Sequence, residues 1–206
     1  MSAKNRGKTT EDGEFYPTPR DVILALLESD LVHLPGGRWI EPCAGTGRII
    51  STVNDYRNDV DWWMCELQPS FAPYLGALCR DRRDLVINPY GDFVHRTWGY
   101  PRAKVLIMNP PFSLAMQFVQ EGLKRADWVV CLQRQGWFGT TGRSAWLAKH
   151  CPDILQLPWR PSFRPDGHRD NCEYCWFIWP PGSVSARRSG TVAMLDRPIG
   201  GQRAMF

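Results

Sequence analysis

The segment Glu41–Gly47, EPCAGTG, combines an acid with two closely spaced glycines directly after a short apolar run. Glycine lets a backbone approach a ligand where a Cβ atom would collide, so this turn is a candidate ligand cradle. It matches neither the dinucleotide pattern G-x-G-x-x-G nor the phosphate loop, which needs a lysine after its last glycine. The segment therefore favours a nucleoside cofactor without a polyphosphate, with a tight strand–helix turn as the alternative.

A second segment, Asn109-Pro110-Pro111-Phe112, follows the most clearly apolar run of the chain. Two prolines hold the backbone extended and remove two N–H donors, so the polar groups left are acceptors: the Asn109 side-chain oxygen and the Pro110 carbonyl. Two acceptors suit the two hydrogens of an exocyclic amino group, and the Phe112 ring offers a face for stacking. The segment predicts a site for a planar amine or amide.

Acids follow two other apolar runs. Glu66 ends the run after the glycine turn, where an acid can accept hydrogen bonds from ribose hydroxyls. Asp92 could accept from an adenine amino group, and Phe93 could pack on a ring or fill the core.

A further segment, Tyr16-Pro17-Thr18-Pro19, precedes the first expected helix, which Thr18 could cap.

Apolar runs and helical patterns alternate along the chain. Consecutive parallel strands require crossovers, whereas two closely spaced strands can form a hairpin. The expected fold class is therefore α/β: a doubly wound, mostly parallel seven-stranded sheet with one antiparallel strand near the C-terminus. The expected strands lie at 38–42, 60–66, 84–88, 103–109, 126–133, 153–158 and 173–179.

Charge is unevenly distributed along the 206 residues, whose formal net charge is only +4. Residues 1–10 contain three basic residues and no acid, and residues 134–169 contain six basic residues against two acids. This distribution suits a polyanionic partner, with solvated tails and loops as the alternative. We expect a flexible basic tail at 1–13, a single catalytic domain at 14–180 and a basic tail at 181–206.

Membrane and metal partners are not expected. No apolar run is long enough to cross a bilayer and the N-terminus lacks a signal-peptide core, so a cytoplasmic location is predicted. The seven cysteines are expected to be free thiols. Cys172 and Cys175 lie three apart in an expected strand, where such positions face opposite sides, so no metal site is predicted.

Together these segments resemble the class I S-adenosylmethionine-dependent methyltransferases, and among them the enzymes that methylate N6 of adenine in DNA. EPCAGTG is similar to their cofactor loop, NPPF to their catalytic signature, and YPTP to the segment that holds the methionine end of the cofactor. The run RPSF…YCWFIW is similar to the end of small phage and prophage adenine methyltransferases. The resemblance covers about residues 14–180 and implies a Rossmann-like methyltransferase fold.

The resemblance also implies roles for individual residues. Asn109, Pro110, Pro111 and Phe112 would form the catalytic segment that holds the target base. The implied reaction moves a methyl group from S-adenosylmethionine to N6 of an adenine flipped out of double-stranded DNA, in a bacterium or a phage-infected host cell. The residues implied to bind the cofactor are Tyr16, Thr18, Glu41, Cys43, Gly45, Gly47, Glu66, Leu67, Asp92 and Phe93.

No segment is long enough for a separate target-recognition domain, so DNA contacts are expected from the loops 133–143 and 161–171 of a monomer or weak dimer. Arginines there could contact phosphates or read guanine, and phosphate contact is favoured. The candidate DNA contacts are Arg134, Arg143, Arg160, Arg164 and Arg169.

Several other functions fit the same motifs. The target could be adenine in RNA, cytosine N4 in DNA or a protein glutamine amide, or the protein could be a DNA-binding relic without catalysis. The basic segments favour nucleic acid over protein, and asparagine at the first motif position favours adenine over cytosine. A role in restriction–modification fits a DNA target.

Overall fold

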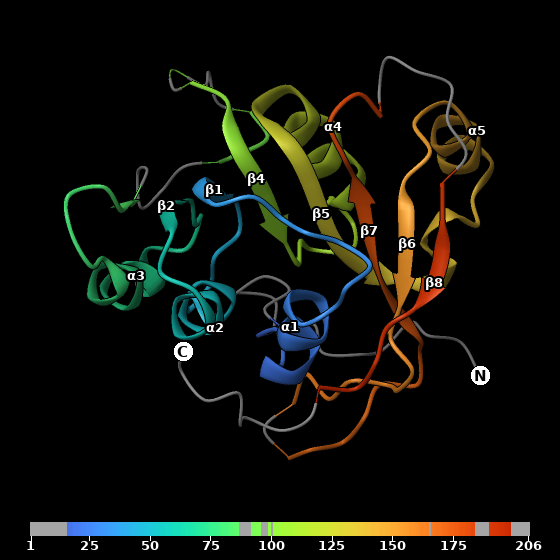
Figure 1. Ribbon diagram of the computed structural model, residues 1–206, viewed down its shortest axis with the longest axis horizontal. Coiled ribbons are helices and arrows are strands. Elements are labelled where there is room, and N and C mark those ends of the chain that lie inside the picture. Colours follow the sequence, from blue (N-terminus) through green and yellow to red (C-terminus); the bar gives the residue numbers. More distant parts are fainter. Residues whose placement is uncertain are drawn as a thin grey trace.

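The computed structural model describes residues 16–86, 92–95, 99, 101–164, 166–183 and 190–198. These residues form one sheet in the order β3-β2-β1-β4-β5-β7-β6-β8, with helices on both faces (Figure 1). The expected tail 1–13 and the parts 184–189 and 199–206 of the other expected tail lie outside the described residues.

The strands are β1 Gly37–Glu41, β2 Val60–Met64, β3 Leu85–Val86, β4 Ala103–Met108, β5 Ala126–Arg134, β6 Asp153–Gln156, β7 Tyr174–Trp179 and β8 Val192–Met194. The α-helices are α1 Arg20–Leu27, α2 Arg48–Tyr56, α3 Ala72–Leu78, α4 Ala115–Arg125 and α5 Thr141–Lys149. Two short 3-10 helices, η1 Pro69–Phe71 and η2 Gln135–Phe138, precede α3 and α5.

The mostly parallel sheet with one antiparallel strand is confirmed. Strands β1 to β5 pair in parallel, because a helix or a long crossover connects each to the next. Strand β7 alone runs against its neighbours, since it pairs antiparallel with both β5 and β6. The β6–β7 pair is the hairpin expected from the two closely spaced runs.

The sheet has eight strands rather than the expected seven. The additional strand β8 pairs in parallel with β6 and lies inside 181–206, the range expected as a tail. After it, Leu195 is 1% exposed and its N–H donates to the Gln156 carbonyl at 2.8 Å. A strand of three residues next to charged positions has almost no periodic signal, which explains why the sequence analysis missed it.

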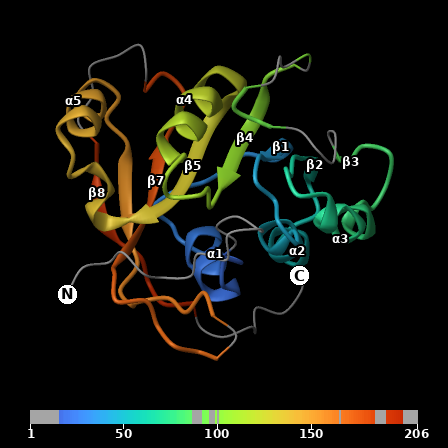
Figure 2. The same cartoon turned by 180° about the vertical axis from the view of Figure 1, so that it is seen from behind.

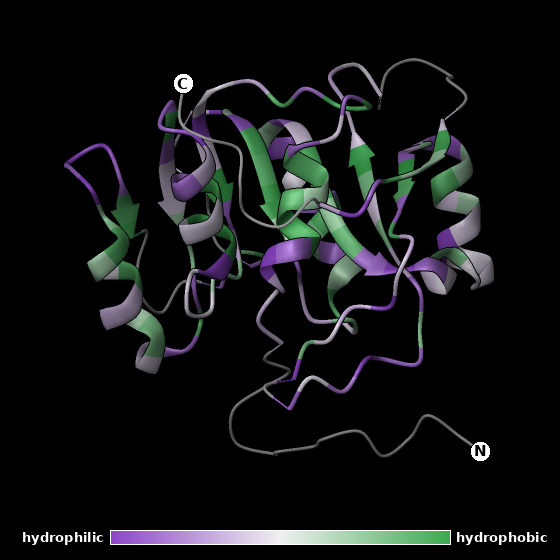
Figure 3. Ribbon diagram, turned by 60° about the horizontal axis from the view of Figure 1, so that its bottom comes forward, coloured by the Kyte–Doolittle hydropathy of each residue, from purple (hydrophilic) through white to green (hydrophobic). Residues whose placement is uncertain are grey.

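Alternate residues of the central strands enter two separate apolar layers. On one face, Val105 and Trp176 pack with α1 and α2, and on the other Leu106 and Phe177 pack with α4 and α5. The α4 helix lies behind the sheet in Figure 1 and in front of it in Figure 2. Apolar residues gather on the central strands (Figure 3), as expected for a sheet covered on both faces.

The carboxyl ends of β1, β2, β4 and β5 meet at one edge of this sheet, and the candidate segments follow directly from them. The segment before α1 also reaches this edge. The sequence suggested that Thr18 caps α1, but the structure places Pro19 at the N-cap position, without a side-chain hydrogen bond. None of the described helices is both long and apolar enough to cross a membrane.

The assignment of 190–198 to the fold can be tested through Leu195. Leu195→Ala should lower the free energy of unfolding by about 2–4 kcal/mol, because it leaves a cavity in the apolar layer that contains residues of α1, α2 and the sheet. Urea denaturation followed by circular dichroism measures the change. Val192→Ala is the control, since this side chain is 72% exposed and its loss should cost less than about 0.5 kcal/mol. Equal effects of the two substitutions would contradict the assignment.

Candidate active site

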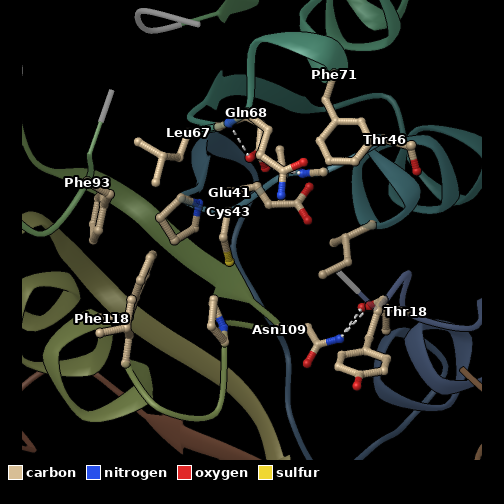
Figure 4. Close-up of a pocket in the computed structure, with 18 of the residues that line it drawn as sticks. Thr18, Glu41, Cys43, Thr46, Leu67, Gln68, Phe71, Phe93, Asn109 and Phe118 are labelled. Carbon is tan, nitrogen blue, oxygen red and sulfur yellow. Dashed lines mark hydrogen bonds between the residues drawn. The ribbon is translucent and has the colours of Figure 1, made fainter. Parts of the chain in front are cut away.

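A cavity of about 430 Å³ opens at the carboxyl ends of β1, β2 and β4 (Figure 4). Three expected segments reach it, although they are far apart in the sequence: the one before α1, the glycine turn after β1 and the start of the N-P-P-F segment. The expected residues that line it are Tyr16, Thr18, Glu41, Cys43, Gly45, Glu66, Leu67, Asp92, Phe93, Asn109 and Pro111.

The two glycines of the turn have different roles. Gly45 lines the cavity with φ +53°, a left-handed conformation that favours glycine. Gly47, at φ +74°, does not line it. A Cβ atom on Gly47 would lie 2.2 Å from Leu78 Cδ1, so glycine at this position allows the turn to lie close to the Leu78 side chain of α3.

Glu41 is 3% exposed at the end of β1, and its Oε2 atom has no hydrogen-bond partner among the residues that the structure describes. Burial and the nearby Glu66 carboxylate raise the pKa of Glu41 well above its ordinary value, and the backbone N–H of Ile50 offsets only part of this rise. The same burial, with Glu41 and Glu66, raises the pKa of the Cys43 thiol. Cys43 is therefore a neutral thiol and not a nucleophile.

The Glu66 carboxylate is fixed by backbone donors. Its Oε2 accepts from the Gly45 N–H at 2.7 Å and its Oε1 from the Gln68 N–H at 2.8 Å. The bond from Gly45 joins the segment after β2 to the glycine turn after β1, and the bond from Gln68 is local. Each oxygen keeps a further lone pair, which is what acceptance from a ribose hydroxyl requires.

The Asp92 carboxylate is already engaged by its own loop. Oδ1 accepts from the N–H groups of Val94 and His95, and Oδ2 lies 2.5 Å from His95 Nδ1. Partial burial raises the pKa of Asp92, but the hydrogen bonds from His95 outweigh burial and bring it below its ordinary value. A ligand amino group would therefore share this acceptor with the His95 ring.

Asn109 has a defined side-chain orientation. Its Nδ2 donates to the Tyr16 carbonyl and to Thr18 Oγ1, both at 3.1 Å, as the dashed line to Thr18 in Figure 4 indicates. Both amide hydrogens are thereby used, and among the described residues no donor reaches Oδ1. The Asn109 side chain thus presents its oxygen as an acceptor at the end of β4, and Thr18 holds the amide in this orientation.

Within the N-P-P-F segment, Pro111 lines the first cavity, and Phe112 faces a second cavity of about 500 Å³. Phe112 lines this second cavity, and Ser113 lines both cavities, so they adjoin. Pro110 is buried and lines neither; its carbonyl accepts a long 3.5 Å hydrogen bond from Gln133 Nε2. The structure therefore separates the two predicted acceptors, because one is open and the other has a protein donor.

The five candidate arginines do not act as one cluster. Arg134 and Arg143 line the second cavity. Arg160 and Arg164 instead form exposed ion pairs, with Glu173 at 2.5 Å and with Asp166 at 3.1 Å. Arg169 is exposed in the loop before β7.

The cavity residues that were not identified from the sequence include Phe71, Phe118 and Gln133. Phe93 stacks on Phe118 at a centroid distance of 5.6 Å and an interplanar angle of 16°, and Phe71 of η1 lies across the cavity from both (Figure 4). Phe118 belongs to an ordinary amphipathic helix, so no sequence signal separates it from core. Gln133, 1% exposed, could have been singled out as a polar residue that ends an apolar strand.

The fold is that of the class I S-adenosylmethionine-dependent methyltransferases, whose solved structures are the neighbours of this chain. The sequence itself matches no protein-family model and no curated protein.

Three solved structures illustrate the range of proteins that share this fold. A Listeria monocytogenes protein described as a class I S-adenosylmethionine-dependent methyltransferase is 17% identical (TM-score 0.62), over 86% of this chain and 65% of its own. A Pyrococcus horikoshii protein described as an RNA methyltransferase is 16% identical (TM-score 0.61), over 82% and 87%. A Vibrio vulnificus protein described as the modification subunit of a type I restriction enzyme is 18% identical (TM-score 0.56), over 94% and 49%. This chain thus spans less than two thirds of the first and third neighbours.

The first cavity fits S-adenosylmethionine in charge and shape. The cofactor carries a sulfonium and an ammonium group, and the buried Oε2 of Glu41 lacks the partner that such a cation would provide. Glu66 and Gly45 form a fixed polar wall, and Leu67, Phe71 and Phe93 supply apolar surface for an adenine ring.

Glu41 should make the stability of the free protein depend on pH. Because its folded-state pKa is raised, the folded protein loses stability as pH rises above the ordinary carboxyl value of 4.5, where the unfolded chain ionises first. Glu41→Gln should remove this loss, so the variant becomes more stable relative to the wild type between about pH 5 and about pH 8. Urea denaturation across that range measures the difference. A pH-independent difference, equal to that of the exposed control Asp30→Asn, would contradict the raised pKa of the buried Glu41 carboxyl.

Proposed function

We propose that this protein transfers a methyl group from S-adenosylmethionine to the N6 amino group of adenine in DNA. The observation that carries the proposal is the orientation of Asn109, whose amide nitrogen is bound by Tyr16 and Thr18 so that Oδ1 is the atom available to a target. This acceptor lies where an acid-lined cavity adjoins a cavity lined by an aromatic ring and arginines.

In this proposal the cofactor supplies an electrophilic methyl group on a positively charged sulfur. Asn109 Oδ1 accepts one hydrogen of the target amino group and directs the nitrogen towards the first cavity. The Pro110 carbonyl can accept the second hydrogen through its remaining lone pair, beside Gln133. Both contacts make the nitrogen more tetrahedral and its lone pair more available, so positioning and electrostatics provide most of the acceleration.

The second cavity is the proposed site of the target base. A base inside duplex DNA cannot reach Asn109, so it must be flipped out of the stack. Phe112 offers an aromatic ring, and Arg143 at the rim can hold a phosphate of the displaced strand. Adenine in RNA, cytosine N4 and a protein glutamine amide carry the same kind of nitrogen, and product analysis decides among them.

Methyl transfer from labelled cofactor to double-stranded DNA, single-stranded DNA and RNA, followed by mass spectrometry of the nucleosides, tests the reaction. We expect N6-methyladenine from DNA. Asn109→Ala should lower kcat by about 10²- to 10³-fold or more, because it removes the acceptor, while calorimetry still detects cofactor binding.

Gln117→Ala, an exposed change on α4 that touches neither cavity, is the control and should keep full activity. N4-methylcytosine, methylated RNA or methylglutamine as the product would contradict the proposed target. A protein that does not bind S-adenosylmethionine would contradict the enzymatic function altogether.

Thr18 provides a more selective test of the Asn109 orientation. Thr18→Val keeps the shape but removes the oxygen that accepts from Nδ2, so the amide can rotate and kcat should fall by about 3- to 10-fold. Thr18→Ser retains the hydroxyl and should keep most of the activity. Single-turnover methyl transfer measures both variants. Equal activity of the valine and serine variants would show that Thr18 does not orient Asn109.

A further inference from the structure

The ring of Phe112, which the proposed function assigns to the target base, is covered by a side chain of the same protein. The guanidinium carbon of Arg134 lies 4.2 Å from the centroid of this ring. Arg134 ends β5 and lines the same cavity as Phe112, so its guanidinium group lies over the ring on which the proposed function places the base.

Two neighbours hold Arg134 in this position. Its Nε donates to the Tyr174 hydroxyl at 3.3 Å, and its Nη2 lies 3.7 Å from Asp170 Oδ2. The Tyr174 hydroxyl donates to the same Asp170 oxygen at 2.8 Å, so the three side chains form one connected group. Arg134 and Tyr174 are also paired in register between β5 and β7, which keeps the anchor opposite the arginine.

The side chain is anchored but not immobilised. The Arg134 side chain is 35% exposed, and its distance to Asp170 is longer than that of a direct hydrogen bond. A cation on an aromatic ring changes affinity by about 2- to 30-fold, whereas a nucleic-acid base stacked on such a ring changes it by about 5- to 150-fold. A base can therefore replace the guanidinium, but a small amide with little π surface cannot.

We propose that Arg134 occupies the target position on Phe112 in the free protein and admits only ligands that stack more strongly than its own guanidinium group. This inference rests on the proposed function and narrows the substrate to nucleobases rather than protein amides. Arg134 is then a specificity-determining residue. Removal of its side chain exposes the ring and lowers the cost of base entry.

Equilibrium binding of 2′-deoxyadenosine and 2′-deoxycytidine to the full chain, saturated with S-adenosylhomocysteine, tests the inference. These probes have no phosphate, so the measurement isolates stacking from charge. Arg134→Ala should bind at least one nucleoside about 2- to 30-fold more tightly than the wild type. Arg134→Gln, which keeps the stem without the cation, should change affinity in the same direction. A gain in affinity is not an effect that a damaged fold would produce.

Arg83→Ala is the matched control. It removes one guanidinium from an exposed side chain that pairs with Asp81 beside β3, at the far edge of the sheet, and should leave nucleoside affinity unchanged. Nucleoside affinity that is unchanged or weaker in both Arg134 variants would overturn the inference. The proposed function fails separately, through the absence of S-adenosylhomocysteine binding to the wild type or through a methylated product other than N6-methyladenine.

Discussion

The two hydrogen bonds that the Asn109 amide donates determine how the site can work. They connect the end of β4 to residues 93 and 91 positions earlier in the chain, at Tyr16 and Thr18. Without them the amide could rotate and present a donor to the same space. The same bonds join β4 to the segment before α1, which lines one side of the first cavity.

The two adjoining cavities differ in charge. The first contains the buried acids Glu41 and Glu66, and the second is lined by Arg134 and Arg143. Burial and the nearby Glu66 raise the pKa of Glu41, and a cation bound in the first cavity would favour its ionised form. In the proposed function, the positively charged cofactor therefore lies on the acid-lined side of Asn109 and the DNA on the arginine-lined side.

Much of this arrangement was predictable from the sequence because it depends on local patterns. Apolar runs located β4 and β5, and the spacing of the last two long runs indicated the β6–β7 hairpin. The bond between Gln133 and Pro110 and the cover of Phe112 by Arg134 were not predictable. They join β5 to the segment that follows β4, so their existence depends on the strand order rather than on any one segment.

The reversed direction of β7 has a consequence for variation in this fold. Parallel strands contribute their last residues to the active edge, whereas β7 contributes its first, at Tyr174. The segment that borders the second cavity is therefore the one that precedes β7, and its ends are set by β6 and by the Arg134–Tyr174 pair. The buried side chains of Leu157, Trp159 and Phe163 attach this segment to the core, whereas its exposed arginines can change without altering the register of β6 and β7.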